Sequence, residues 1–88
     1  MNRKIQRYSI KDFGFNYTDL PSDAFFMDLR VKGEVIVVTF LIDTEAPKHR
    51  RAFYVAKSGE ELSDEYEFEY LDATIFNGEL AYLFEQKY

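Results

Sequence analysis

Seven carboxylates between residues 60 and 72 are the densest group of side chains in this sequence that could do chemistry, and no lysine or arginine lies among them. From residue 65 to residue 70 carboxylates alternate with aromatic rings, so carboxylates on one face of a strand would recur about every 6.6–6.8 Å. Such a row could bind a hard cation or the basic surface of a partner. The carboxylates belong to Glu60, Glu61, Asp64, Glu65, Glu67, Glu69 and Asp72.

We interpret this acidic stretch as a partner-binding surface whose charges resemble the phosphates of a nucleic acid. A rigid row of negative charges can occupy a basic groove on another protein and steer association over long range. The same side chains would also protect a sheet edge against unwanted pairing, and that alternative stays open. We expect no metal site, because the acids are accompanied by no cysteine, no pair of histidines and no calcium-loop motif.

A basic tetrapeptide at residues 48–51 is the second group with chemical potential. Lys48, Arg50 and Arg51 could bind a phosphate or a partner carboxylate, although a solvated hairpin tip explains the same composition. His49, the single histidine, has no partner fixed by sequence spacing, so we expect an exposed loop residue rather than a general base. The sequence therefore predicts no catalytic residue and no cofactor, and we do not expect an enzyme.

The net charge of −5 is unevenly distributed along the chain. Residues 1–57 contain ten Lys or Arg and seven acids, whereas residues 58–88 contain nine acids and one lysine. Without a dominant basic patch, direct nucleic-acid binding is disfavoured. No apolar run approaches the roughly 20 residues that a membrane-spanning helix needs, and the absence of cysteine fits a reducing compartment. We expect no membrane association and place the protein in the cytoplasm of a bacterial host.

The elements that position these side chains are predicted to be β-strands, because apolar residues alternate with polar ones. Residues 4–10 form the first strand with Tyr8 and Ile10 facing one side, and residues 11–20 form a short strand or an ordered loop. Residues 27–31 form a strand whose odd-numbered side chains face the core. The pair Lys32-Gly33 predicts a hairpin that leads into residues 35–42, which are apolar on both faces and so central, buried from both sides or covered by a loop.

The second half of the chain follows the same pattern. Residues 43–51 are a polar loop, a strand begins near residue 51, and residues 60–64 form a turn or a single helical turn. Residues 66–76 form a long strand with Tyr66, Phe68 and Tyr70 facing the core, and its phase changes near residues 71 and 72. Asn77-Gly78 predicts a tight hairpin, because both residues tolerate positive φ, and residues 80–85 return as the last strand.

Together these elements predict an all-β protein with a single domain over residues 1–88. Neighbouring strands usually pair, so we expect an antiparallel meander or a small open barrel of five to six strands. The segment at residues 60–64 leaves room for one short helical turn.

The order of these features resembles a family of small uncharacterised proteins, a domain of unknown function found mainly in bacteriophage and mobile-element genomes. The family pattern has a basic-aromatic first strand, a Leu-Pro-x-x-Ala turn, an apolar central strand ending in Asp, an Arg-x-Phe strand and a final strand ending in Phe-Glu. The matching segments here are residues 5–10, 20–24, 35–43, 51–55, 58–59, 70–74 and 84–85. The resemblance implies a phage setting and a fold, and it carries no activity.

Two functions are consistent with these observations. The first is a small acidic phage-type protein that inhibits or modulates a host protein with a basic surface, such as a nucleic-acid-dependent defence complex in the manner of an anti-CRISPR protein. The second is a small-molecule binder or nucleotide sponge, in which rings stack on the ligand and Arg50 or Arg51 binds its phosphate. A structural phage accessory role is a further alternative. The sequence does not specify the oligomeric state.

Overall fold

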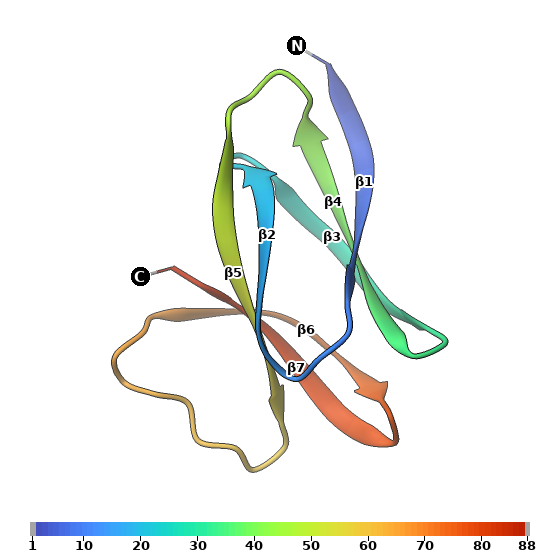
Figure 1. Cartoon of the computed structure of the whole chain (residues 1–88), viewed down its shortest axis with the longest axis vertical. Helices are drawn as coiled ribbons and strands as arrows, with labels where there is room; N and C mark the ends of the chain where they lie inside the picture. Colours follow the sequence, from blue (N-terminus) through green and yellow to red (C-terminus); the bar gives the residue numbers. More distant parts are fainter. Residues whose placement is uncertain (1, 88) are drawn as a thin grey trace.

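The computed structural model describes residues 2–87, which form seven antiparallel β-strands and no helix (Figure 1). The all-β prediction is confirmed. The expected five to six strands are too few, because residues 14–21 form a full strand, and residues 60–64 form no helical turn. The strands are β1 (Arg3–Ile10), β2 (Gly14–Pro21), β3 (Phe25–Lys32), β4 (Val35–Asp43), β5 (Lys48–Lys57), β6 (Phe68–Phe76) and β7 (Glu79–Gln86).

The strands form two sheets that share one core, with the orders β1-β4-β3 and β2-β5-β7-β6. Two tight hairpins join neighbours in sequence. The β6–β7 hairpin turns at Asn77 and Gly78, whose φ angles are 53° and 77°, as their residue types predict. The β3–β4 hairpin turns at Gly33 (φ 63°) and Glu34, one residue later than the sequence indicates.

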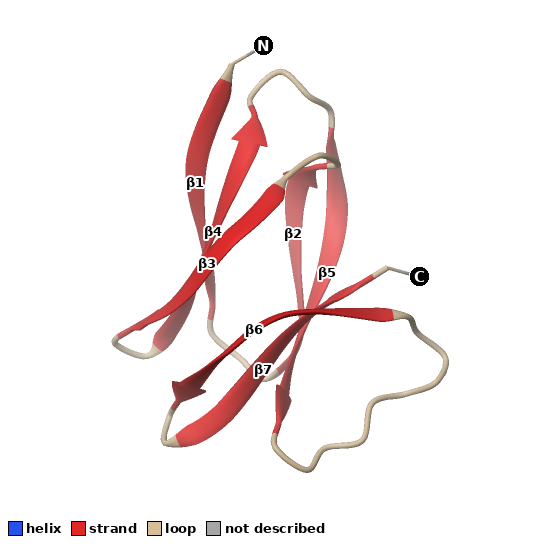
Figure 2. Ribbon diagram, turned by 180° about the vertical axis from the view of Figure 1, so that it is seen from behind, coloured by secondary structure: helices blue, strands red, loops and turns tan. Residues whose placement is uncertain are grey.

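The meander and the open barrel are wrong, because three strand pairings join segments distant in sequence. β1 pairs with β4, β2 pairs with β5, and β5 pairs with β7, all antiparallel. The short segment between β1 and β2 carries the chain from one sheet to the other (Figure 2). Two layers result, because each sheet is apolar on one face and must bury that face against another element.

The core lies between the two sheets and is built from one side of each strand. β4 is the central strand of its sheet, as expected, and Ile36, Val38, Phe40 and Ile42 are buried on its inner side. The alternate side chains of β4 are half-buried on the outer side, over which the main contacts among the described strands place no other strand. The expectation that β4 is covered on both faces is therefore wrong. Tyr8 and Ile10 of β1 face this core, as predicted.

The acidic-aromatic segment differs from its prediction in extent and in direction. β6 begins at Phe68, so Glu65, Tyr66 and Glu67 lie in the loop that precedes the strand. The rings of Tyr66 and Tyr70 are 39% and 55% exposed, so the prediction that they face the core is wrong. The alternation is real, but the core lies on the opposite side of the strand. The predicted phase change is confirmed as a bulge between Tyr70 and Asp72.

A bulge also shifts the pattern of β3. The register with β4 changes between Phe26 and Asp28, which leaves Met27 without a cross-strand partner. Phe26 and Leu29 pack against the core, whereas Met27 and Val31 are exposed. The prediction that all three odd-numbered residues of this strand face the core is right for Leu29 and for Val31, which is 38% exposed but pairs with the buried Ile36, and it is wrong for Met27.

Candidate functional site

The outer side of the four-stranded sheet carries a continuous group of aromatic rings, which we call the aromatic face. Strand alternation explains it: in β5 the side chains of Phe53 and Val55 are buried in the core, so the side chain of Tyr54 between them points outward. Cross-strand partners share a face, which places Phe15 beside Tyr54 and Tyr70 beside Phe84. The aromatic face consists of Phe15, Tyr17, Tyr54, Tyr66, Phe68, Tyr70 and Phe84.

Phe15 stands at the centre of this group. Its ring centroid lies 4.8 Å from that of Tyr54, 5.7 Å from Tyr66, 6.1 Å from Tyr17 and 6.3 Å from Phe68. Edge-to-face and offset pairs at such separations contribute about 0.5–1.5 kcal/mol each beyond their buried area. The rings therefore hold one another in place, and the surface is ordered before any partner arrives.

Much of this aromatic surface is open to solvent. Tyr17 is 54% exposed and Tyr70 55% exposed, and the apolar surface continues to Ile75 and Leu80, which pair across the β6–β7 hairpin and are both exposed. The contacts between elements place no strand over this side of the sheet. Contiguous exposed apolar surface on a small protein commonly marks a binding site.

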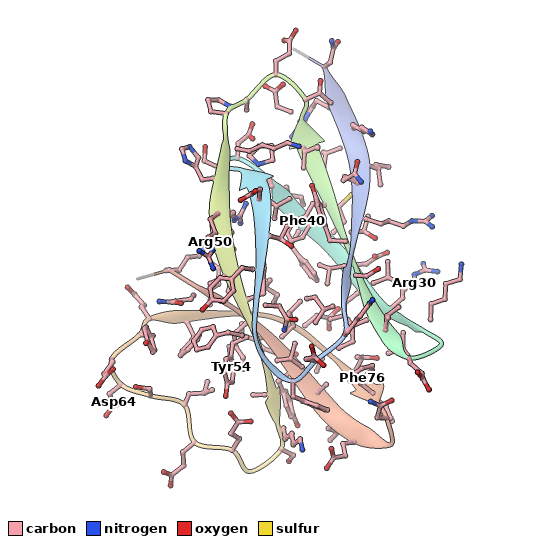
Figure 3. All side chains as sticks on the ribbon, viewed as in Figure 1. Arg30, Phe40, Arg50, Tyr54, Asp64 and Phe76 are labelled. Atoms are coloured by element: carbon pink, nitrogen blue, oxygen red, sulfur yellow. The ribbon has the colours of Figure 1, made fainter. Side chains whose placement is uncertain are left out.

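An acidic loop, residues 58–67, borders the aromatic face between β5 and β6 (Figure 3, in which Asp64 marks its outer edge). Glu60 anchors the loop at its start: one carboxylate oxygen accepts a hydrogen bond from the Tyr54 hydroxyl, and the other accepts one from the backbone N–H of Lys57 at 3.1 Å. The bond to Glu60 also raises the pKa of Tyr54. At the far end, the backbone N–H of Lys87 donates to the carbonyl of Glu67 at 2.7 Å.

The loop brings five of the seven predicted carboxylates together beside the rings, and Glu61, Asp64, Glu65 and Glu67 are exposed. The other two lie elsewhere. Glu69 faces the same side as Glu85 and lies 3.5 Å from the ammonium of Lys87, and a carboxylate oxygen of Asp72 accepts a hydrogen bond from the N–H of Ala73. A straight row of strand carboxylates is therefore wrong, because most of the acids precede β6.

The predicted basic cluster is split between the two sides of β5. Arg51 points inward, and its guanidinium donates to both oxygens of Glu85, at 2.6 and 2.7 Å, and to the carbonyls of Pro21 and Ala24. A phosphate cannot bind Arg51 without displacing these partners. Arg50 points outward, and its guanidinium carbon lies 4.3 Å from the ring centroid of Tyr17 (Figure 3). Lys48 and His49 are exposed.

The buried carboxylate of Glu85 is the most perturbed acid of the site region. Burial raises its pKa, but the hydrogen bonds and charges of Arg51 and Lys87 outweigh burial, so the pKa of Glu85 lies below its ordinary value. These charges line a cleft of about 440 Å³ between β3 and the β6–β7 pair. Since Arg51, Glu85, Lys87 and Glu69 are ion-paired with one another there, the network joins β5, β6 and β7 within the four-stranded sheet rather than awaiting a ligand.

The aromatic face was missed by sequence reasoning, although composition contained a signal. The chain has nine Phe and seven Tyr, more rings than so small a core can bury. Among the described residues, the fully buried rings are Phe40, Phe53 and Phe76. Most of the remaining rings must then lie at least partly at the surface, and their clustering on one sheet face is what the structure adds.

Residues 2–87 contain no group of three His, Asp or Glu side chains arranged to hold a metal ion, and no helix long and apolar enough to cross a membrane. Comparison with family models, curated proteins and solved structures found no match to this chain.

Proposed function

We propose that this chain is a binding protein that inhibits or modulates another protein by docking on it through the aromatic face and the acidic loop. The observation that supports this proposal is the uncovered surface of seven mutually packed rings, continuous with a loop of five carboxylates. The phage-type setting suggested by the sequence makes the partner a host protein, and a nucleic-acid-dependent defence complex fits the charge of the loop.

The surface has the composition that strong protein interfaces use. Tyrosine and other aromatic side chains are enriched at interface hot spots, because they bury a large area at low cost in conformational entropy. The ring contacts around Phe15 reduce that entropic cost further, since the rings are already ordered. The carboxylates of the loop add attraction at long range and so select a partner with a basic surface.

The chemistry of the partner follows from these two parts. A surface rich in lysine and arginine would place cations over the exposed rings of Tyr17 and Tyr70 and next to the carboxylates of Glu61 and Glu65. The carboxylates do not have the regular spacing of nucleic-acid phosphates, because they lie in a loop. We therefore attribute the contribution of these carboxylates to binding to their negative charge, and not to a likeness in shape to nucleic acid.

The test is affinity capture from a nuclease-treated host lysate at low and high salt, followed by binding measurements with the purified captured protein. The variant E61Q/D64N/E65Q removes three charges from the acidic loop, and Y17S/Y70S removes two exposed rings. We expect each variant to weaken binding at least tenfold, corresponding to about 1.4 kcal/mol or more. D12N/D23N/E34Q, which removes three charges outside this surface, is the matched control.

A captured protein supports the proposal only if it has a basic surface and binds the purified chain directly. If both surface variants bind it as tightly as the unmodified chain does, the aromatic face and the acidic loop are not the docking site and the proposal fails.

A further inference from the structure

The outer side of the three-stranded sheet has the opposite charge to the acidic loop. The strand register places the side chains of this outer side in rows that cross β1, β4 and β3. The successive rows are Ile5, Leu41 and Phe25, then Arg7, Thr39 and Asp28, then Ser9, Val37 and Arg30. Four cationic side chains therefore surround an apolar centre. We call this the basic face, and its residues are Arg3, Ile5, Arg7, Phe25, Arg30, Lys32, Val37 and Leu41.

The basic face is uncovered and retains an excess of positive charge. Ile5 is 60% exposed and Phe25 62% exposed at its centre, and the contacts between elements place no strand over it. Two acids lie among its four cations. Asp28 lies 3.6 Å from Arg30, and a carboxylate oxygen of Asp43 accepts a hydrogen bond from the backbone N–H of Glu45. Asp28 therefore offsets part of the charge of Arg30, and four cations against two acids leave the face with two positive charges in excess.

The basic face and the aromatic face lie on the outer sides of different sheets, and they approach each other at the cleft that Phe25 and Tyr70 both line. The inner sides of both sheets meet at one core, so the outer side of each sheet faces away from that core. Figure 3, a view down the shortest axis of the molecule, shows Arg30 at the right and Arg50 and Asp64 at the left. One chain therefore presents two open apolar surfaces of opposite charge, one on the outer side of each sheet.

We propose that copies of this chain associate head to tail, with the basic face of one copy docked on the aromatic face and acidic loop of the next. Arg7 and Arg30 would meet exposed rings and loop carboxylates, and Ile5 and Phe25 would pack on the aromatic surface. Pairing of like faces is disfavoured, because it would bring acidic loop against acidic loop or cation against cation. Such a contact is heterologous, so it leaves one free face at each end of every assembly.

This inference does not depend on the proposed function, although both use the aromatic face. A host protein bound to the aromatic face would end an assembly at that point, and self-association would in turn compete with host-protein binding. Failure of lysate capture would leave head-to-tail association intact. A strictly monomeric protein would leave the proposed function intact.

The experiment is sedimentation velocity on the 88-residue chain over a range of concentrations at low and high salt. We expect the average sedimentation coefficient to rise with concentration at low salt, to continue beyond the dimer and to fall when salt is added. Two variants separate the faces: R7Q/R30Q removes two of the four cations of the basic face, and E61Q/E65Q/E67Q removes three of the five carboxylates of the acidic loop. Each alone should weaken self-association roughly tenfold or more. Circular dichroism checks that each variant keeps its β-structure.

A mixture of the two variants gives the sharper result. Each variant keeps the face that the other lacks, so we expect them to form one-to-one dimers that do not grow further. Neutral glutamine is used so that the two altered faces do not attract each other. K4Q/K11Q, which removes two cations outside the basic face, is the control and should associate like the unmodified chain.

Three results would overturn head-to-tail association. The first is a protein that stays monomeric at every concentration at low salt. The second is self-association that neither R7Q/R30Q nor E61Q/E65Q/E67Q weakens. The third is an assembly that stops at the dimer, because an isologous pair of identical faces would produce it.

Discussion

At the scale of single residues, the Arg51–Glu85 pair is a buried polar contact that joins β5 to β7 within the four-stranded sheet. Glu85 is 5% exposed, and both of its oxygens accept hydrogen bonds from the guanidinium of Arg51. The same guanidinium also donates to the carbonyls of Pro21, the last residue of β2, and Ala24, the residue before β3. Arg51 thereby ties β5 to β7 and to the segment that connects β2 with β3, which explains why one member of an otherwise exposed basic tetrapeptide points inward.

We predict that Glu85→Gln lowers the free energy of unfolding by about 3–5 kcal/mol, because it leaves the buried guanidinium of Arg51 without its counter-charge. Urea denaturation measures this change. Glu79→Gln on the same strand is the control, since the exposed pair of Glu79 with Lys57 at 3.6 Å should contribute less than about 1 kcal/mol. Equal losses for the two variants would contradict this account of the buried pair.

The same substitution has a pH signature. The pKa of Glu85 in the folded chain lies below its ordinary value of about 4.3, so the ionised carboxylate stabilises the fold above that pH. This contribution is lost as the pH falls through the folded-state pKa. We therefore expect the difference in unfolding free energy between the unmodified chain and Glu85→Gln to shrink progressively below about pH 4.

At the scale of elements, the sequence reveals strands more readily than the side on which the core lies. The alternation of rings and carboxylates before β6 indicated a strand, and Phe68 and Tyr70 do share a face. Period-two alternation has no preferred side, however, and the assumption that rings face inward was wrong. On β5 both sides carry apolar residues, so only the packing of Phe53 and Val55 against the other sheet shows which side is inner.

The acidic loop gives a prediction at this scale, because one of the two hydrogen bonds that the Glu60 carboxylate accepts comes from Tyr54 on the aromatic face. Tyr54→Phe removes the hydroxyl that donates to Glu60, and we expect amide hydrogen exchange within residues 58–67 to become several-fold faster. Global stability should change by only about 0.5–1.5 kcal/mol. Tyr17→Phe, on the same face but distant from Glu60, should leave exchange in the loop unchanged. Unaltered exchange in Tyr54→Phe would show that the loop is held by other contacts.

At the scale of the whole molecule, local signals identified both hairpins but not the sheets. The turns at Gly33 and Asn77-Gly78 are encoded by residues that tolerate positive φ. The pairings of β1 with β4 and of β2 with β5 join distant segments, and no short-range pattern specifies them. For the same reason the candidate site could be predicted only in part: five of its acids were identified, but the rings that lie beside them come from β2, β5, β6 and β7.

The inside and outside of the molecule can be distinguished by two substitutions on one strand. Phe76 is buried at the end of β6, and its ring lies 5.5 Å from that of Phe13. We predict that Phe76→Ala costs about 3–5 kcal/mol of unfolding free energy, because it removes the ring and leaves a cavity in the core. Tyr70→Thr, on the outer side of β6, should cost about 1 kcal/mol or less, since it loses one ring contact with Phe84 and keeps a β-branched residue. Urea denaturation of both variants measures the difference. A large loss for Tyr70→Thr would mean that the aromatic face is part of the folding core, and its role as an open binding surface would then have no basis.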